Sequence, residues 1–174
     1  FYKDNCVYPT CNGADVLVPF PESSSNYNDL LSWLDGVETY PAGTNKELRA
    51  NGSTPIAGSL TAALNWLTST GATTVGSLPG PKARDTKAVC RAYNVILITD
   101  GAENCDVRGN AGNQDRATGP AAAAAALYAQ GIKTYVIGFA VNDATLNAAA
   151  SAGQGMSCAA PYTSCPVDAI LANN

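Results

Sequence analysis

Thr54 and Asp100 are the two side chains whose types and surroundings are typical of a ligand-binding edge in an α/β protein. Asp100 directly follows the apolar and β-branched run 95–99 and precedes Gly101, and Thr54 stands immediately before Pro55 and a helical pattern. A hydroxyl and a carboxylate are hard oxygen donors, which favour Mg²⁺, Ca²⁺ or Mn²⁺ and disfavour zinc. The alternative is structural, because threonine caps helices and aspartate caps the turns or helices that follow strands.

Two predicted elements position these residues. The run 95–99 is short and apolar on both faces, which predicts a fully buried strand of a parallel sheet, with Leu97 covered on both sides. Ligands of open α/β sheets bind beyond the carboxyl ends of the strands. The predicted helix at 56–69 carries apolar side chains at helical spacing: Ile56, Leu60, Leu64 and Leu67. The helix is expected to run antiparallel to the strand, away from the edge of the sheet at which the strand ends. We therefore expect Thr54, before the helix, and Asp100, after the strand, at the same edge of the sheet.

The whole chain, 1–174, is predicted to form one domain. Its other predicted elements are an edge strand at 15–20, a short helix at 29–36, a helix at 118–131, a second buried strand at 132–139, a helix at 143–152 and, in the tail, a strand near 159–163 with a short helix around Ala169. Strands that alternate with helices predict right-handed crossovers and a parallel sheet. No internal repeat or linker divides the chain.

Composition excludes several classes of function. Hydrophobic residues make up 46% of the chain and charged residues 14%, with a net charge of −4. This balance argues against a nucleic-acid partner, which needs clustered lysine and arginine. No apolar run approaches the length of a membrane span. The chain has no histidine, which excludes His-dependent catalytic triads and His-ligated zinc.

The cysteines indicate an oxidising compartment. There are six, none in a Cys-x-x-Cys arrangement: Cys6, Cys11, Cys90, Cys105, Cys158 and Cys165. An even number without metal-binding spacing predicts disulfides, and hence an extracellular, cell-surface or periplasmic location. Close spacing suggests Cys6–Cys11 and Cys158–Cys165, which leaves Cys90 with Cys105. That last pair brackets a strand about 20 Å long, whereas bonded cysteines need Cα atoms within about 7 Å, so the connectivity stays open.

Three segments, 51–60, 95–101 and 131–139, resemble a von Willebrand factor type A domain of the bacterial secreted or surface type. The resemblance implies a doubly wound, mostly parallel, Rossmann-like sheet flanked by helices. It also implies a metal-ion-dependent adhesion site, built from an Asp-x-Ser-x-Ser loop, a threonine and an aspartate. By motif match Thr54 is that threonine and Asp100 is that aspartate. The flanking cysteines and the alanine-rich composition also resemble those of the tip adhesins of type IV pili.

The Asp-x-Ser-x-Ser motif occurs nowhere in the chain. In the family order, 15–20 is the antiparallel edge strand, so the first strand, the first helix and most of the second strand are missing. We therefore expect an N-terminally incomplete domain whose partners include the rest of its own polypeptide before Phe1. The alternative is a rearranged domain whose sheet is complete without those elements. The resemblance implies Mg²⁺ or Ca²⁺, with Mn²⁺ as a further option, only if the missing motif is supplied.

The sequence favours a binding module over an enzyme. The leading hypothesis is a metal-dependent adhesion or protein-binding module that binds a divalent cation together with an acidic group of a protein or surface ligand. A metal-independent scaffold with a degenerate site is the second. A Mg²⁺-dependent α/β hydrolase ranks third, because the chain has no second strand-end carboxylate and no Gly-rich phosphate loop. Three nearby acids are expected to be solvated surface residues: Glu103, Asp106 and Asp115.

Overall fold

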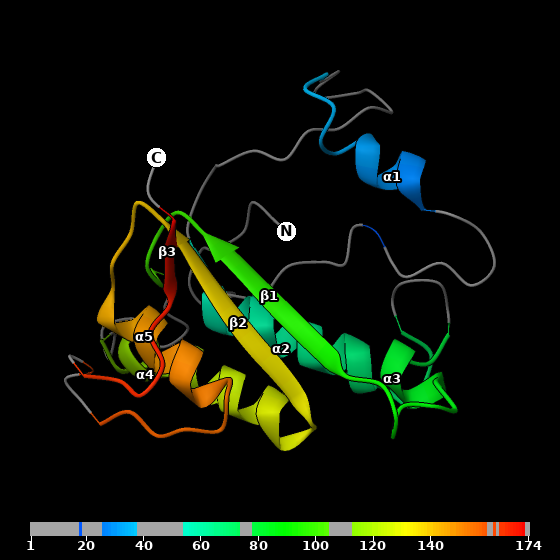
Figure 1. Ribbon diagram of the computed structural model, residues 1–174. Helices are drawn as coiled ribbons and strands as arrows, with labels where there is room; N and C mark the ends of the chain where they lie inside the picture. Colours follow the sequence, from blue (N-terminus) through cyan, green and yellow to red (C-terminus); the bar gives the residue numbers. More distant parts are fainter. Residues whose placement is uncertain are drawn as a thin grey trace.

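The computed structural model describes residues 18, 26–37, 54–73, 78–104, 113–159, 162 and 164–172, without the side chains of 113–118 (Figure 1). Its elements are α1 (Tyr27–Leu31), α2 (Ile56–Thr68), α3 (Pro81–Arg84), β1 (Tyr93–Thr99), α4 (Asn113–Ala129), β2 (Ile132–Phe139), α5 (Ala144–Ala152) and β3 (Ile170–Ala172). The predicted strand at 15–20 lies outside the described residues except for Val18. In the tail, the predicted helix around Ala169 is wrong, because the short strand β3 begins at Ile170 instead.

The described strands form one parallel sheet in the order β1-β2-β3. Tyr93 pairs with Ile132 at one end of the first ladder and Thr99 pairs with Gly138 at the other. Helices connect the strands, and Figure 1 shows α2, α4 and α5 behind the same face of the sheet. An α/β architecture with a parallel sheet, as the sequence predicted, is therefore confirmed.

The hydrophobic core lies between the sheet and these helices. Every second side chain of β2 is buried there: Ile132, Thr134 and Val136, with Gly138 in the same alternation. Leucines from the helices meet them, one each from α2, α4 and α5: Leu60, Leu127 and Leu146. The alanines of α4 and α5 let these helices pack closely, since a small side chain brings the backbones together without leaving a cavity.

The opposite face of the sheet, which we call the outer face, is exposed at β1, so the prediction of a strand buried on both sides is wrong. Ile96 and Ile98 of β1 are 63% and 61% exposed, and only the alternate residues, Val95 and Leu97, pack against the core. Leu97 is half-buried rather than enclosed. The physical reason is that the described helices cover one face only, so the alternation of a strand exposes every second apolar side chain.

Helix boundaries follow local chemistry. The helix predicted at 143–152 is α5, and Asp143 is its N-cap, because the Asp143 carboxylate accepts a hydrogen bond from the Thr145 N–H at 2.8 Å. By contrast α4 begins at Asn113, five residues before the predicted start at 118. Gly131 has a φ of +70° between α4 and β2, a backbone conformation that favours glycine and lets the helix end in a tight turn.

Candidate site at the carboxyl end of β1

The structure brings Thr54 to the residue that follows Asp100. A Cβ atom placed on Gly101 would lie 3.2 Å from the Thr54 hydroxyl oxygen and 4.0 Å from its methyl carbon. Thr54 precedes α2, and Gly101 follows β1 by one exposed residue, Asp100. The hydroxyl therefore lies at the carboxyl end of β1, the edge where parallel sheets place their ligands.

Two hydrogen bonds between Thr54 and Asn104 hold the loop after β1 against the segment before α2. The Thr54 N–H donates to the Asn104 side-chain oxygen, and the Asn104 N–H donates to the Thr54 carbonyl at 3.3 Å. Within the loop, the Thr99 hydroxyl donates to the Gly101 carbonyl at 2.7 Å and accepts from the Gly101 N–H at 3.2 Å. These bonds fix the backbone on both sides of Asp100, while its own side chain stays exposed to solvent.

Glu103 caps α2 from a position 46 residues away in the sequence. Its carboxylate accepts a hydrogen bond from the Ala57 N–H at 2.7 Å, and the residue is only 6% exposed. The first N–H groups of a helix have no partner within the helix, and the positive end of its dipole attracts a carboxylate. The prediction that Glu103 is a solvated surface residue is wrong. Asp106 lies outside the described residues, and so does the side chain of Asp115.

The capping alternative for Thr54 is contradicted by the same contact. The residue at the N-cap position of α2 is Pro55, and no side chain at that position bonds to the helix. Glu103 supplies the cap instead, so the Thr54 hydroxyl is not used for it. Sequence reasoning missed Glu103, because nothing local distinguishes a capping glutamate from a solvated one when the helix it caps lies on another part of the chain.

Thr54 and Asp100 carry oxygen donors of the kind that hard cations bind. They could supply one hydroxyl and one carboxylate oxygen, whereas Mg²⁺ takes six ligands and Ca²⁺ about six to eight. Within the described part of the chain, no group of three or more His, Cys, Asp or Glu residues could hold a metal ion. Any cation there would need further oxygen ligands, from water, a partner or chain beyond the described residues.

At the amino end of β1, a different carboxylate is held entirely by protein groups. Asp85 accepts hydrogen bonds from the Lys87 N–H at 2.8 Å and the Tyr93 hydroxyl at 2.9 Å, and it pairs with Arg91 at 3.2 Å. The Lys87 N–H first, then Tyr93 and Arg91, hold the pKa of Asp85 below its ordinary value. Burial and the neighbouring Asp85 raise the pKa of Tyr93. These contacts make the cluster structural.

The structure confirms one of the suggested cysteine pairs and answers the question left open for Cys90. Cys158 and Cys165 form a disulfide with their Cα atoms 4.9 Å apart. Cys90 is a free, exposed thiol, so the Cys90–Cys105 pair is not formed. Cys90 lies just before the start of β1. The remaining cysteines lie outside the described residues.

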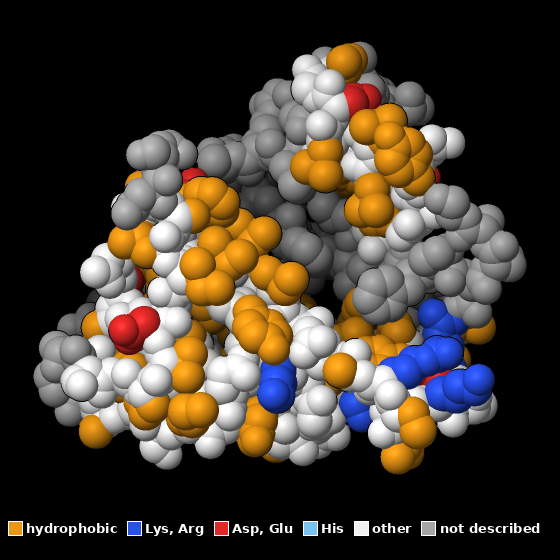
Figure 2. Space-filling view, in the orientation of Figure 1, with side chains coloured by type: hydrophobic (Ala, Val, Ile, Leu, Met, Phe, Trp, Pro, Cys, Tyr) orange, Lys and Arg blue, Asp and Glu red, His pale blue; other side chains and the backbone are white. Residues whose placement is uncertain are grey.

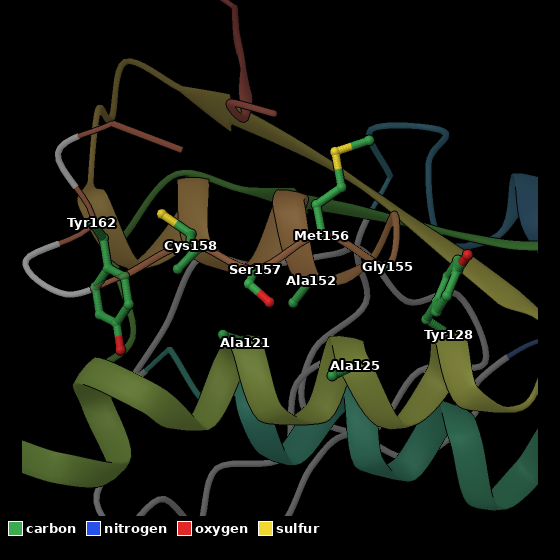
Figure 3. Close-up of a pocket in the computed structure, with 10 residues that line it drawn as sticks. Ala121, Ala125, Tyr128, Ala152, Gly155, Met156, Ser157, Cys158 and Tyr162 are labelled. Atoms are coloured by element: carbon green, nitrogen blue, oxygen red, sulfur yellow. The ribbon is translucent and has the colours of Figure 1, made fainter. Parts of the chain in front are cut away.

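A separate pocket of about 420 Å³ lies between α4, α5 and the chain that follows α5. Figure 3 shows Tyr128 and Tyr162 at its two ends, with Ala121 and Ala125 of α4 between them. Gly155 is required beside Tyr128, since a Cβ atom there would lie 2.3 Å from the tyrosine ring. The lining is apolar with a few hydroxyls, and it offers no carboxylate or basic group for acid–base chemistry.

Comparison with protein-family models, with curated proteins and with solved structures found no match for this chain. The resemblance to von Willebrand factor type A domains therefore stays a prediction from three motifs. Among the described helices, none combines the length and apolar character needed to cross a membrane.

Proposed function

We propose that this chain is a cation-dependent adhesion or protein-binding module of a secreted or cell-surface protein. The observation that supports the proposal best is the position of the Thr54 hydroxyl against Gly101, next to the exposed Asp100, at the carboxyl end of β1. Pro55 stands at the N-cap of α2 and Glu103 accepts from the Ala57 N–H, so neither of these contacts uses that hydroxyl. The proposed family is the von Willebrand factor type A domain, with a doubly wound sheet.

The proposed cation is Mg²⁺ or Ca²⁺, with Mn²⁺ as a third option. Thr54 and Asp100 would hold it through a hydroxyl and a carboxylate, the oxygen donors that such ions prefer. The Asp-x-Ser-x-Ser motif, which these 174 residues lack, would complete the ligand set where it is supplied. A bound cation supplies positive charge at the sheet edge, which attracts an acidic group on a protein or surface ligand.

The proposal includes no enzyme activity. The chain has no histidine to act as a general base. Asp85 at the other end of β1 is already held by Tyr93, Arg91 and a backbone N–H, so it does not serve as a second carboxylate for hydrolysis. An oxidising location, extracellular, cell-surface or periplasmic, is proposed from the Cys158–Cys165 disulfide, since such bonds persist in those compartments.

A metal-independent binding scaffold is the second candidate, and the loop after β1 favours it. Asn104 and Glu103 hold that loop to the start of α2 with protein groups alone. Hydrogen bonds between protein groups therefore help to position the site edge. In this alternative, partners would bind through side chains of the sheet or loops, and Thr54 and Asp100 would have no special role.

Cation titration by isothermal calorimetry separates the two candidates. The protein expressed from its complete gene is titrated with Mg²⁺, Ca²⁺ and Mn²⁺, as wild type, Asp100→Asn and Thr54→Val. We expect binding in the wild type, a loss of at least about tenfold in affinity for each variant, and no change in the control Asp168→Asn, which removes the charge of another exposed aspartate. Wild-type binding that both variants retain would reject the proposed site, and absence of binding would favour the scaffold.

A further inference from the structure

The segment 82–91, which contains most of α3 and leads to β1, is basic in a chain that is acidic as a whole. It holds four of the ten Lys and Arg residues together with one acidic residue: Lys82, Arg84, Lys87, Arg91 and Asp85. Its net charge is therefore +3, whereas the whole chain carries −4, so the remaining residues together carry −7. We call 82–91 the basic turn, and Figure 2 shows Lys and Arg side chains gathered where Figure 1 places α3.

Asp85 holds the backbone of the basic turn in place. Its carboxylate accepts a hydrogen bond from the Lys87 N–H at 2.8 Å and pairs with the Arg91 guanidinium at 3.2 Å. Its carbonyl accepts a hydrogen bond from the Ala88 N–H at 3.0 Å. The Cys90 N–H donates to the Lys87 carbonyl at 2.9 Å. Because the protein itself fixes this backbone, a ligand of the turn does not have to order it, which lowers the entropic cost of binding.

The apex of the basic turn is apolar. Val89 is 99% exposed, so its side chain adds nothing to the hydrophobic core. Lys87 precedes it by two residues and is exposed. Arg91 follows it by two residues, and the Arg91 side chain is 60% exposed although it pairs with Asp85. The turn thus presents an apolar side chain to solvent between two cationic ones.

We propose that the basic turn binds an anionic lipid surface, with Val89 inserted at the boundary between the headgroups and the acyl chains. Lys82, Lys87 and Arg91 would meet the lipid phosphates, and each such cation strengthens binding to an anionic membrane by about fivefold. Insertion removes the Val89 side chain from water, which folding does not do. A few cations and one apolar side chain give weak, reversible binding, which holds a protein near a surface without anchoring it.

The apolar apex favours a lipid surface over a soluble polyanion. A polyanion in solution would attract the cations, but it offers no apolar region for Val89. A bilayer offers both, because acyl chains lie directly beneath its charged headgroups. Charge also orients the chain: the residues outside the basic turn carry −7 together, so an anionic surface repels them on balance and attracts the turn.

The basic turn and the proposed cation site lie at opposite ends of β1. Val89 precedes the strand and Asp100 follows it, and a strand of seven residues spans about 20 Å. Figure 1 shows α3 beside the end at which the β1 arrow begins. Binding through the turn therefore leaves the carboxyl end of β1 free to meet a partner. The inference does not rest on the proposed cation-dependent function.

Vesicle co-sedimentation tests the proposal on the protein expressed from its complete gene. The vesicles contain equal parts of phosphatidylglycerol and phosphatidylcholine, and EDTA removes divalent cations so that the proposed cation site takes no part. We expect binding that weakens as NaCl is raised from about 0.1 M to 1 M, because the Debye length falls from about 10 Å to 3 Å. Lys87→Gln should lower the partition coefficient about fivefold, and Val89→Ser about tenfold.

Matched controls separate the turn from general effects of charge and apolar surface. Lys133→Gln removes an exposed lysine of β2, and Val37→Ser removes a valine that is 54% exposed, so both should change binding much less than the test variants. The test variants should keep the wild-type melting temperature, because Lys87 bonds to Asp85 through its backbone N–H and the Val89 side chain is exposed.

Three results would overturn the proposal. The first is the absence of binding to the anionic vesicles, or equal binding to vesicles of phosphatidylcholine alone. The second is an equal loss of binding in the test and control variants, or no loss in any of them. The third is binding that Lys87→Gln weakens and Val89→Ser does not, which would assign the turn to a soluble polyanion instead.

Discussion

The two ends of β1 each carry a carboxylate, and the surroundings of these carboxylates differ. At the amino end, Asp85 is bonded to a tyrosine hydroxyl, an arginine and a backbone N–H, so its charge is used inside the protein. At the carboxyl end, the Asp100 side chain is exposed, and hydrogen bonds between Thr99 and Gly101 hold the backbone on both sides of it. The Thr54 hydroxyl lies against Gly101, the next residue. A carboxylate whose position is fixed by other groups, rather than by its own bonds, remains available to a ligand.

The carboxyl end depends on Glu103 for this arrangement. Glu103→Ala removes the described side-chain cap of α2 and leaves the part-buried Ala57 N–H without that partner, so we expect a loss of about 1–2 kcal/mol in the free energy of unfolding. Urea unfolding measures it. Glu103→Gln keeps an acceptor and should lose less, whereas Asp168→Ala, at an exposed site, should change stability little. A loss below about 0.5 kcal/mol for Glu103→Ala would show that the loop is not held by this contact.

Leu97 lies in the strand that joins the two ends. Full burial on both sides would make Leu97→Ala cost about 2–5 kcal/mol. Because the structure leaves Leu97 half-buried, with one face of β1 open, we expect about 1–2 kcal/mol in urea unfolding. Ile98→Ala, on the exposed side of the same strand, is the matched comparison and should lose less. Equal losses at both positions would mean that the outer face is covered in solution.

The amino end makes a pH-dependent contribution. The pKa of Asp85 is lowered in the folded state, so its stabilisation is present above pH 4 or so and is lost as the pH falls through the folded value. The pKa of Tyr93 is raised, so its stabilisation is present below about pH 10 and is lost as the pH rises beyond it. Tyr93→Phe should reduce both dependences and lower the melting temperature by about 2 °C at neutral pH. Thermal unfolding from pH 2 to 11 measures this, and unchanged profiles would show that the cluster does not titrate with folding.

The sequence predicted those parts of the molecule that depend on local pattern and on the order of the elements. The helix at Ile56–Thr68 and the strands that begin at Tyr93 and Ile132 follow from the period of their apolar residues. The expectation that Thr54 and the end of β1 lie at the same edge of the sheet followed from the opposite directions of one helix and one strand. The helix and the strands need only residues close together in the chain, whereas the shared edge also needs the order and direction of the elements.

Contacts between distant parts of the chain could not be predicted in the same way. The Glu103 bond to Ala57 joins residues 46 positions apart, and the composition around Glu103 is that of an ordinary polar loop. The exposed Ile96 and Ile98 were predicted as buried because an apolar run does not show whether one or both of its faces are covered. The bond network of Asp85 forms only when α3 and the start of β1 meet.

The most direct test of the proposed cation site is a crystal structure of the full gene product soaked with Mn²⁺, with anomalous scattering to locate the ion. The account predicts a manganese peak at the carboxyl end of β1, about 2.2 Å from both the Thr54 hydroxyl oxygen and an Asp100 carboxylate oxygen. The same crystals of Asp100→Asn should show the peak weakened or absent. A well-ordered edge without a peak, or a peak bound by other residues, would contradict the assignment of Thr54 and Asp100 as ligands.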